Sequence, residues 1–171
     1  MRGFLDRIYD GAAYAAAVFM IGTLVFVLLG IFGRILGFHL RGTDAYAGYC
    51  MAACGFLALA HTLRQGEHIR VTLVLDHVAP RVRRALELAC LVAGIALAGL
   101  LAGYSVRLAW QSHAFNDIST ANDATPLWIP QLGMAAGALL LAAAFVEAFV
   151  LALRGEMPLR AGADHEPARM E

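Results

Sequence analysis

Side chains with reactive chemistry are few and scattered in this sequence of 171 residues. Three cysteines are present, and Cys50 and Cys54 share one face of an expected helix. A structural metal site would need a second pair of cysteines or histidines at suitable spacing, which the sequence lacks. We therefore interpret all three cysteines, Cys90 included, as small apolar packing residues, and we expect no metal site.

The ionisable side chains inside apolar stretches are Glu87, Glu147 and His61. Transport chemistry usually places charges at mid-membrane. Both glutamates instead lie near the ends of their stretches, and Glu87 can pair with Arg83 or Arg84 one helical turn away. We interpret His61 as a hydrogen-bonded packing residue. Because the sequence has no glycine-rich phosphate loop and no usable Ser-His-Asp set, we expect neither catalysis nor a cofactor.

Long apolar blocks carry these residues. The chain is 60% hydrophobic and 15% charged, whereas soluble domains have about 25% charged residues. Four blocks reach the length of about 20 residues that a membrane-crossing helix needs. They are residues 11–33, 45–63, 88–106 and 127–146. We predict an all-α transmembrane domain over residues 1–154, followed by a disordered polar tail over residues 155–171.

The first block is expected to be retained, because its uncharged run exceeds the roughly 7–15 residues of a signal-peptide core. Net charge is zero, with 13 basic and 13 acidic residues, which argues against a nucleic-acid partner. All basic residues are arginines, and ten of the 13 lie in the termini and the connection between the second and third spans. Since basic residues favour the cytoplasmic side, we predict that both termini are cytoplasmic.

The connection between the second and third spans is too apolar for a free loop. Valines and leucines between positions 71 and 78 share one helical stripe, which favours an amphipathic segment lying in the membrane interface. Residues 69–75 also alternate in polarity, which favours a short strand, and both alternatives stay open. Pro80 suits the first turn of the third helix. Arg81, Arg83 and Arg84 are expected to anchor that helix among lipid headgroups.

The connection between the third and fourth spans is polar and ends in Thr125-Pro126-Leu127-Trp128-Ile129-Pro130. Thr125 can cap a helix whose first residue is Pro126. Trp128 suits the aromatic belt at the membrane surface. The polar stretch before this motif is either a solvated loop or a contact for a soluble partner.

Two Gly-x-x-x-Gly pairs lie well inside expected spans, Gly99 with Gly103 and Gly133 with Gly137. Such pairs allow the backbones of two helices to approach closely. Among 17 glycines such pairs arise easily by chance. The uncharged centres of all four spans, without a catalytic or ion site, favour a subunit that packs against a partner over an autonomous transport machine.

Both connections resemble signatures of one membrane-protein family. Gly66-Glu67-His68-Ile69-Arg70-Val71, followed by Pro80, resembles the "G-x-H-I-x-V" and "L-P" signature of the small, DctQ-like subunit of tripartite ATP-independent periplasmic (TRAP) transporters. Pro126-Leu127-Trp128-Ile129-Pro130 resembles the family's "P-L-W-I-P" entry to its last helix. Thr72 stands where the family often has aspartate. Length, four spans and cytoplasmic termini agree with the family, and the resemblance extends to about Arg154.

This resemblance implies a scaffold function in the bacterial inner membrane. The family's large membrane subunit carries the substrate and sodium sites, and a periplasmic solute-binding protein delivers an organic acid. The small subunit holds the stationary part of the large subunit, and uptake is driven by the sodium gradient. The motif residues Gly66, His68, Ile69, Arg70 and Val71 are then expected to shape the cytoplasmic segment, and residues 125–130 the outer end of the last helix.

Two other hypotheses remain. An autonomous four-helix transporter or channel would need a polar path, for which Thr23, Tyr49, Tyr104 and Ser105 are the candidates within the spans. A quinone-linked redox subunit would need paired histidines at haem-ligand spacing, but His61 is the only histidine inside an expected span.

Overall fold

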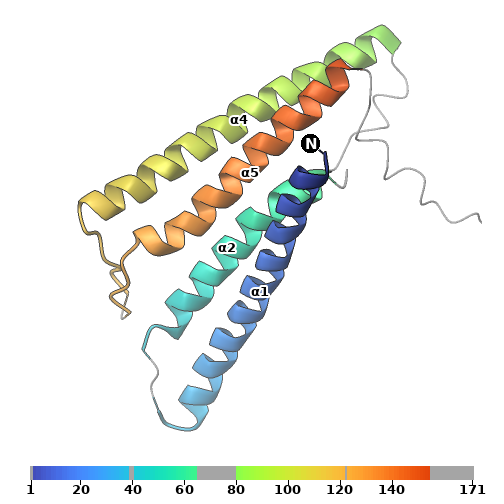
Figure 1. Cartoon of the computed structure of the whole chain (residues 1–171). Helices are drawn as coiled ribbons and strands as arrows, with labels where there is room; N and C mark the ends of the chain where they lie inside the picture. Colours follow the sequence, from blue (N-terminus) through green and yellow to red (C-terminus); the bar gives the residue numbers. More distant parts are fainter. Residues whose placement is uncertain (1, 39–40, 65–79, 122, 155–171) are drawn as a thin grey trace, which may run out of the picture.

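Four long helices make up the described structure. The computed structural model describes residues 2–38, 41–64, 80–121 and 123–154. The helices, labelled as in Figure 1, are α1 (Arg2–Ile35), α2 (Thr43–Arg64), α4 (Pro80–Ala114) and α5 (Trp128–Leu153). All four are long and apolar enough to cross a membrane, and the described residues form no strand. The predicted all-α membrane fold is confirmed.

The helices extend beyond most of the spans expected from sequence. In hydrocarbon the backbone must satisfy its own hydrogen bonds, so an apolar stretch becomes a helix whatever its packing. The helix α4 has 35 residues and continues past Arg107, which directly follows the expected span over residues 88–106. The exact limits of the membrane spans, and the tail over residues 155–171, stay predictions.

Glycines in left-handed conformation separate α1 from α2. At the end of α1 the backbone N–H of Leu36 donates to Phe32 O at 2.9 Å, and Gly37 follows with a φ of 77°. Gly42 has a φ of 83° and directly precedes α2. Residues other than glycine rarely adopt this backbone conformation. These two glycines therefore set where the first helix ends and where the second begins.

The helices form a layer in the order α1, α2, α5, α4 (Figure 1). Two antiparallel hairpins, α1 with α2 and α4 with α5, meet through α2 and α5, which leaves α1 and α4 at the edges. Residues 36–42 join α1 to α2, and residues 115–127 join α4 to α5. Both connections lie at the same end of the layer, hereafter the loop end. The first residue of α1 and the last of α5 lie at the opposite end.

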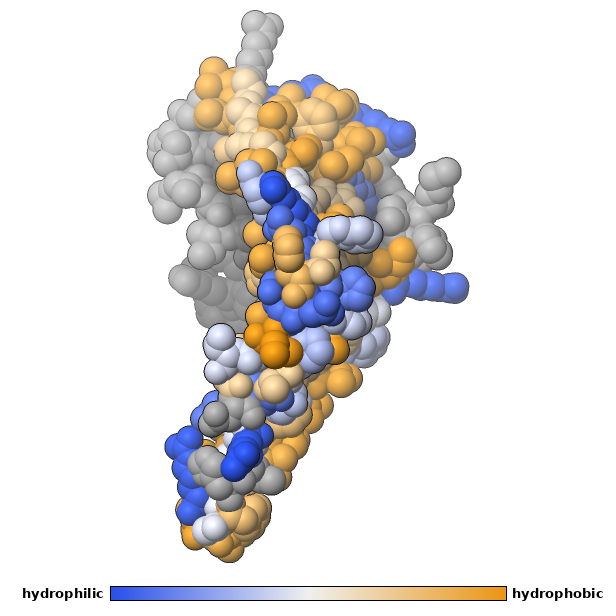
Figure 2. Space-filling model, turned by 90° about the vertical axis from the view of Figure 1, so that its left-hand side faces the viewer, coloured by the Kyte–Doolittle hydropathy of each residue, from blue (hydrophilic) through white to orange (hydrophobic). Residues whose placement is uncertain are grey.

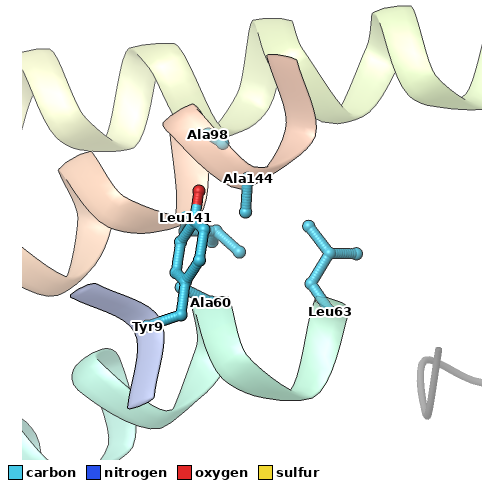
Figure 3. Close-up of a cluster of buried hydrophobic side chains, with 6 residues drawn as sticks. All are labelled: Tyr9, Ala60, Leu63, Ala98, Leu141 and Ala144. Atoms are coloured by element: carbon cyan, nitrogen blue, oxygen red, sulfur yellow. The ribbon is translucent and has the colours of Figure 1, made fainter. Parts of the chain in front are cut away.

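The buried core is small and made mainly of alanine. Away from the loop end, Tyr9 of α1 is 1% exposed and reaches past α2 toward α5 (Figure 3). Its cluster includes Ala60 and Leu63 of α2, Ala98 of α4, and Leu141 and Ala144 of α5. Small side chains let helices approach closely, which suits association in lipid, where the hydrophobic effect does not drive helices together.

Glycines of α5 make the contact between the two hairpins. A Cβ atom on Gly137 would overlap the backbone carbonyl of Phe56 in α2, and one on Gly133 would lie 3.0 Å from the Ala53 Cβ. Gly22 of α1 is similarly close to Cys50, whose Sγ would lie 3.3 Å from a Cβ there. The Gly133/Gly137 pair therefore performs the close packing that its spacing predicts.

Large apolar side chains cover much of the outer surface. On α1, Val18 and Ile21 are 68% and 62% exposed, and on α4 Leu97 is 69% exposed. Figure 2 views the molecule from the loop-end side, where hydrophilic residues gather across the middle and at the bottom while hydrophobic residues cover the upper part. Exposed apolar surface of this extent indicates contact with lipid or with another membrane protein.

Candidate functional site

A polar network at the loop end joins α2 to the connection between α4 and α5. The Tyr49 hydroxyl lies 2.9 Å from Ser119 Oγ and donates to Asp123 Oδ2 at 3.2 Å. One turn earlier in α2, the Tyr46 hydroxyl lies 3.2 Å from Thr125 Oγ1. The two tyrosines project to the same side because they are three residues apart in a helix. They connect the second hairpin to the first at the loop end.

Aromatic contacts hold the two tyrosines in place. Phe26 of α1 stacks on Tyr46 with ring centroids 5.4 Å apart, and the rings of Tyr46 and Tyr49 meet edge to face at 6.2 Å. Such pairs prefer offset or edge-to-face geometry. The apolar packing of α1 on α2 thus positions the hydroxyl groups that reach the loop.

The loop over residues 115–127 folds back on itself. The Ser119 N–H donates to Thr125 O at 2.8 Å, and the Leu127 N–H donates to Asp117 O at 3.0 Å. Ile118 and Pro126 form an isolated antiparallel bridge between these bonds. The described residues of this loop therefore form a hydrogen-bonded turn. Whether the loop is only solvated or meets a soluble partner stays a prediction.

Two further contacts shape this loop. A Cβ atom on Gly42 would lie 2.7 Å from the Asp123 Cβ, so only glycine fits where the first connection meets the second. The Ser119 Oγ also accepts a hydrogen bond from the Ala121 N–H at 3.2 Å. The residues of the network, which we call the loop-end network, are Gly42, Tyr46, Tyr49, Ser119, Asp123 and Thr125.

Hydrogen bonding lowers the pKa of Asp123. The Thr125 side chain contributes most, and Ser119, the Asp123 backbone amide and Tyr49 add to the effect, while desolvation opposes it. Hydrogen bonds to a carboxylate favour its charged form. Asp123 is therefore an anionic acceptor at neutral pH, to which the Tyr49 hydroxyl donates.

The Thr125–Pro130 motif enters the last helix differently from the prediction. The sequence analysis placed Thr125 as the helix cap, and this was wrong. The helix begins at Trp128, its N-cap is Leu127 without a side-chain cap, and the Thr125 hydroxyl is engaged with Tyr46 instead. Pro130 lies in the first turn, where a backbone N–H has no partner within the helix, so its missing donor costs little.

Trp128 connects the start of α5 to the end of α4. Its ring meets that of His113 edge to face, with centroids 5.2 Å apart. Ile129, the next residue, is 48% exposed. The motif therefore combines residues that turn inward to the loop and to α4 with residues that face outward.

The opposite end carries the charged groups expected near the cytoplasm. Pro80 is the first residue of α4, as its type predicts, and Arg84 is exposed. Arg83 Nε lies 3.2 Å from Glu87 Oε1, which confirms the expected pairing. The Arg81 side chain and the motif residues Gly66, His68, Ile69, Arg70 and Val71 lie outside the described residues, so the choice between amphipathic segment and strand stays open.

His61 and Glu147 lie between helices near this end. His61 Nδ1 of α2 is 4.0 Å from Asp10 Oδ1 of α1. Glu147 of α5 is partly buried. Within the described part of the chain, no three His, Cys, Asp or Glu side chains come together in a way that could hold a metal ion.

Sequence reasoning missed the loop-end network. Tyr49 had been considered only as part of a polar path, and Tyr46, Ser119 and Asp123 had no assigned role. Two tyrosines one turn apart at the start of an apolar helix were a usable signal. The sequence held no sign that their partners lie 70 residues or more away. The network can hold the two hairpins together. Asp123 Oδ2 accepts a hydrogen bond from Tyr49, while the buried Asp123 Oδ1 has no partner among the described residues.

Four apolar helices with an ordered polar loop at one end define a multi-pass membrane protein. Residues 23–155, more than three quarters of the chain, match the family described as "Tripartite ATP-independent periplasmic transporters, DctQ component". The chain belongs to this family. Members of the family are components of transporters and work together with other subunits. No match to a curated protein was found.

Proposed function

We propose that this chain is the small scaffold subunit of a TRAP transporter in the bacterial inner membrane. In this function it holds the stationary part of the large membrane subunit, while the large subunit moves an organic acid with the sodium gradient. A periplasmic solute-binding protein delivers the acid. The chain performs no catalysis and binds no cofactor; its contribution is mechanical.

The observation that carries this proposal is the combination of family membership with uncharged span centres. Over residues 11–33, 45–63, 88–106 and 127–146, the only charged or histidine side chain is His61. Ion and substrate pathways in membranes are usually marked by intramembrane ionisable groups. A layer of helices without them is suited to supporting a partner that has its own pathway.

The motif residues fit the scaffold function as shaping elements. Residues 125–130 fix the loop and the start of α5 at the loop end, which we place on the periplasmic side. Gly66, His68, Ile69, Arg70 and Val71 shape the cytoplasmic segment, and Arg81, Arg83 and Arg84 anchor the start of α4 at the cytoplasmic surface.

Co-purification tests the proposal. The tagged chain is expressed with its cognate large subunit and extracted in a mild detergent. We expect a stoichiometric complex by size-exclusion chromatography with multi-angle light scattering. A large subunit from an unrelated TRAP system is the control and should not be retained. Separate migration of the two cognate chains would contradict the proposal.

Transport assays separate this function from that of an autonomous transporter. Cells that lack the small subunit should lose sodium-dependent uptake, and expression of the chain should restore it. Liposomes that contain the purified chain alone should accumulate no solute. Accumulation by the chain alone would favour the autonomous transporter instead.

A further inference from the structure

Two Gly-x-x-x-Gly pairs of the chain have different surroundings. The pair Gly133 and Gly137 on α5 is filled by the backbone and side chains of α2. On α4, a Cβ atom added to Gly99 or to Gly103 would meet nothing within 4 Å. The same spacing is thus used inside the chain at one place and left open at the other.

The open pair lies on the side of α4 that faces away from α5. The buried residues of α4 in this region are Ala98, Ala102, Ser105 and Ala109. Gly99, Gly103 and Arg107 follow one another at intervals of four residues and are all exposed. Since α4 forms an edge of the layer (Figure 1), no described helix covers this side. We call the surface formed by Ala96, Gly99, Gly103 and Arg107 the open face of α4.

A charge marks one end of the open face. Among the described residues, none forms an ion pair or hydrogen bond with the Arg107 guanidinium. The uncharged stretch over residues 88–106 would span about 28 Å as a helix, close to the hydrocarbon thickness of about 30 Å. Arg107 therefore lies where the hydrocarbon ends, and a cation there favours an anionic group at the same depth.

We propose that the open face of α4 receives a transmembrane helix of the large subunit, which carries a carboxylate at the depth of Arg107. The inference rests on the proposed scaffold function and specifies which surface performs it. Lipid chains make no better contact with glycine than with a larger side chain. A helix backbone, in contrast, can approach an open glycine pair closely, as α2 approaches Gly133 and Gly137. The charge of Arg107 then selects the partner helix and fixes its register, because guanidinium pairs in bidentate geometry with carboxylate.

Among the described residues, α2 offers a competing surface for such a helix. An apolar groove of about 490 Å³ runs along α2, lined by Gly48, Met51, Ala52, Gly55, Phe56 and Leu59. No charged side chain lines it. A charge that can select one partner helix is therefore present on the open face of α4 and absent from the α2 groove, and variants at both places decide between the two surfaces.

Co-purification with the cognate large subunit tests the inference. Gly99→Leu, Gly103→Leu and Arg107→Glu should each reduce the amount of retained large subunit by about tenfold, through steric overlap or charge repulsion with the partner helix. Gly11→Leu is the matched control, because Gly11 of α1 is also an open helical glycine. Each variant is first purified without the large subunit, and its thermal unfolding midpoint should be no lower than that of the wild type, because replacing an open helical glycine can add helix propensity.

A charge exchange gives the sharper result. Arg107→Glu should be rescued when one intramembrane acid of the large subunit is changed to arginine, and that second change alone should also weaken the complex. Retention of the large subunit by all three α4 variants at wild-type levels would overturn the inference. Loss of the complex in Gly55→Leu but not in the α4 variants would assign docking to the α2 groove, which also overturns it.

Two other outcomes are equally decisive. If Arg107→Glu lowers only the amount of co-purified phospholipid, measured as bound phosphate, then Arg107 meets lipid headgroups and the inference fails. If the wild-type chain does not retain its large subunit at all, the scaffold function fails and this inference fails with it. Intact wild-type complex with unaffected variants leaves the scaffold function standing and removes only the inference about α4.

Discussion

At the scale of single residues, one tyrosine hydroxyl connects two parts of the chain that are 70 residues apart. Tyr49 reaches both Ser119 and Asp123 from the start of α2. A hydrogen bond of this kind typically contributes about 0.5–1.5 kcal/mol to stability. Its two partners lie on a loop that belongs to the other hairpin, so the hydroxyl stabilises the position of the loop as well as the fold.

Removal of this hydroxyl should therefore destabilise the chain. We expect Tyr49→Phe to lower the free energy of unfolding by about 1 kcal/mol, because Ser119 and Asp123 each lose a partner while the ring packing is kept. Denaturant unfolding in detergent measures the change. Tyr104→Phe is the matched control, since Tyr104 is 65% exposed on α4. Equal losses in the two variants would show that the loop-end network does not stabilise the fold.

The lowered pKa of Asp123 predicts a dependence of stability on pH. A group whose folded pKa is below its ordinary value stabilises the fold above the ordinary pKa, and this contribution disappears as pH falls through the folded pKa. The wild type should therefore lose stability as pH falls below about 4, the ordinary aspartate range. Asp123→Asn should be less stable at pH 7 and should lose less on acidification.

Thermal unfolding midpoints in detergent between pH 7 and pH 3 measure this effect. Asp117→Asn is a suitable control, because it removes a neighbouring loop carboxylate whose side chain takes no part in the loop-end network. The prediction fails if Asp123→Asn and the wild type lose stability in parallel over the whole range.

At the scale of helices, the contact between α2 and α5 depends on the absence of a side chain. Gly137→Ala should lower the free energy of unfolding by about 1–3 kcal/mol, the usual cost of overpacking, because the new Cβ would overlap the Phe56 backbone. Gly55→Ala is the matched control, since nothing lies within 4 Å of a Cβ there. It should be neutral or gain up to about 1 kcal/mol from helix propensity. Similar effects of both changes would contradict the packing of α2 on α5.

The helices themselves could be predicted from sequence, whereas their order in the layer could not. Apolar blocks of the required length leave helices as the only way to satisfy the backbone in lipid, so composition alone indicates four spans. The pairs Gly99/Gly103 and Gly133/Gly137 have the same spacing, yet only the second is filled within the chain. Which pair packs inside depends on the complementary face of α2, which local sequence patterns do not report.

In the candidate site too, local features could be predicted from the sequence, whereas long-range contacts could not. Pro80 and the Arg83–Glu87 pair follow from local rules about helix starts and turns, and both lie where those rules place them. Thr125 was misplaced because its hydroxyl has two possible partners, a backbone amide of the helix or a residue of α2. Tertiary contact with Tyr46 decides between them. Local sequence patterns could not reveal that choice, because Tyr46 and Thr125 are 79 residues apart.

At the scale of the whole molecule, the open layer of helices explains why this chain suits a partner. A closed four-helix bundle buries one face of every helix against the others. Here α1 and α4 each pack along one neighbour, and much of their surface is apolar and exposed. In a membrane such surface faces lipid or another subunit, and an open layer presents more of it than a closed bundle of the same length.

The orientation of this layer is the last prediction. Arginine placement predicts that the loop end lies outside and that both termini lie in the cytoplasm. We expect a membrane-impermeant maleimide to label Asn116→Cys in intact spheroplasts and Ala168→Cys only after permeabilisation, in a background where Cys50, Cys54 and Cys90 are changed to alanine. The cysteine-free chain is the control for background labelling. Labelling of Ala168→Cys in intact spheroplasts, with protection of Asn116→Cys, would show that the orientation is opposite to the predicted one. It would also place the loop-end network in the cytoplasm, out of reach of any periplasmic partner.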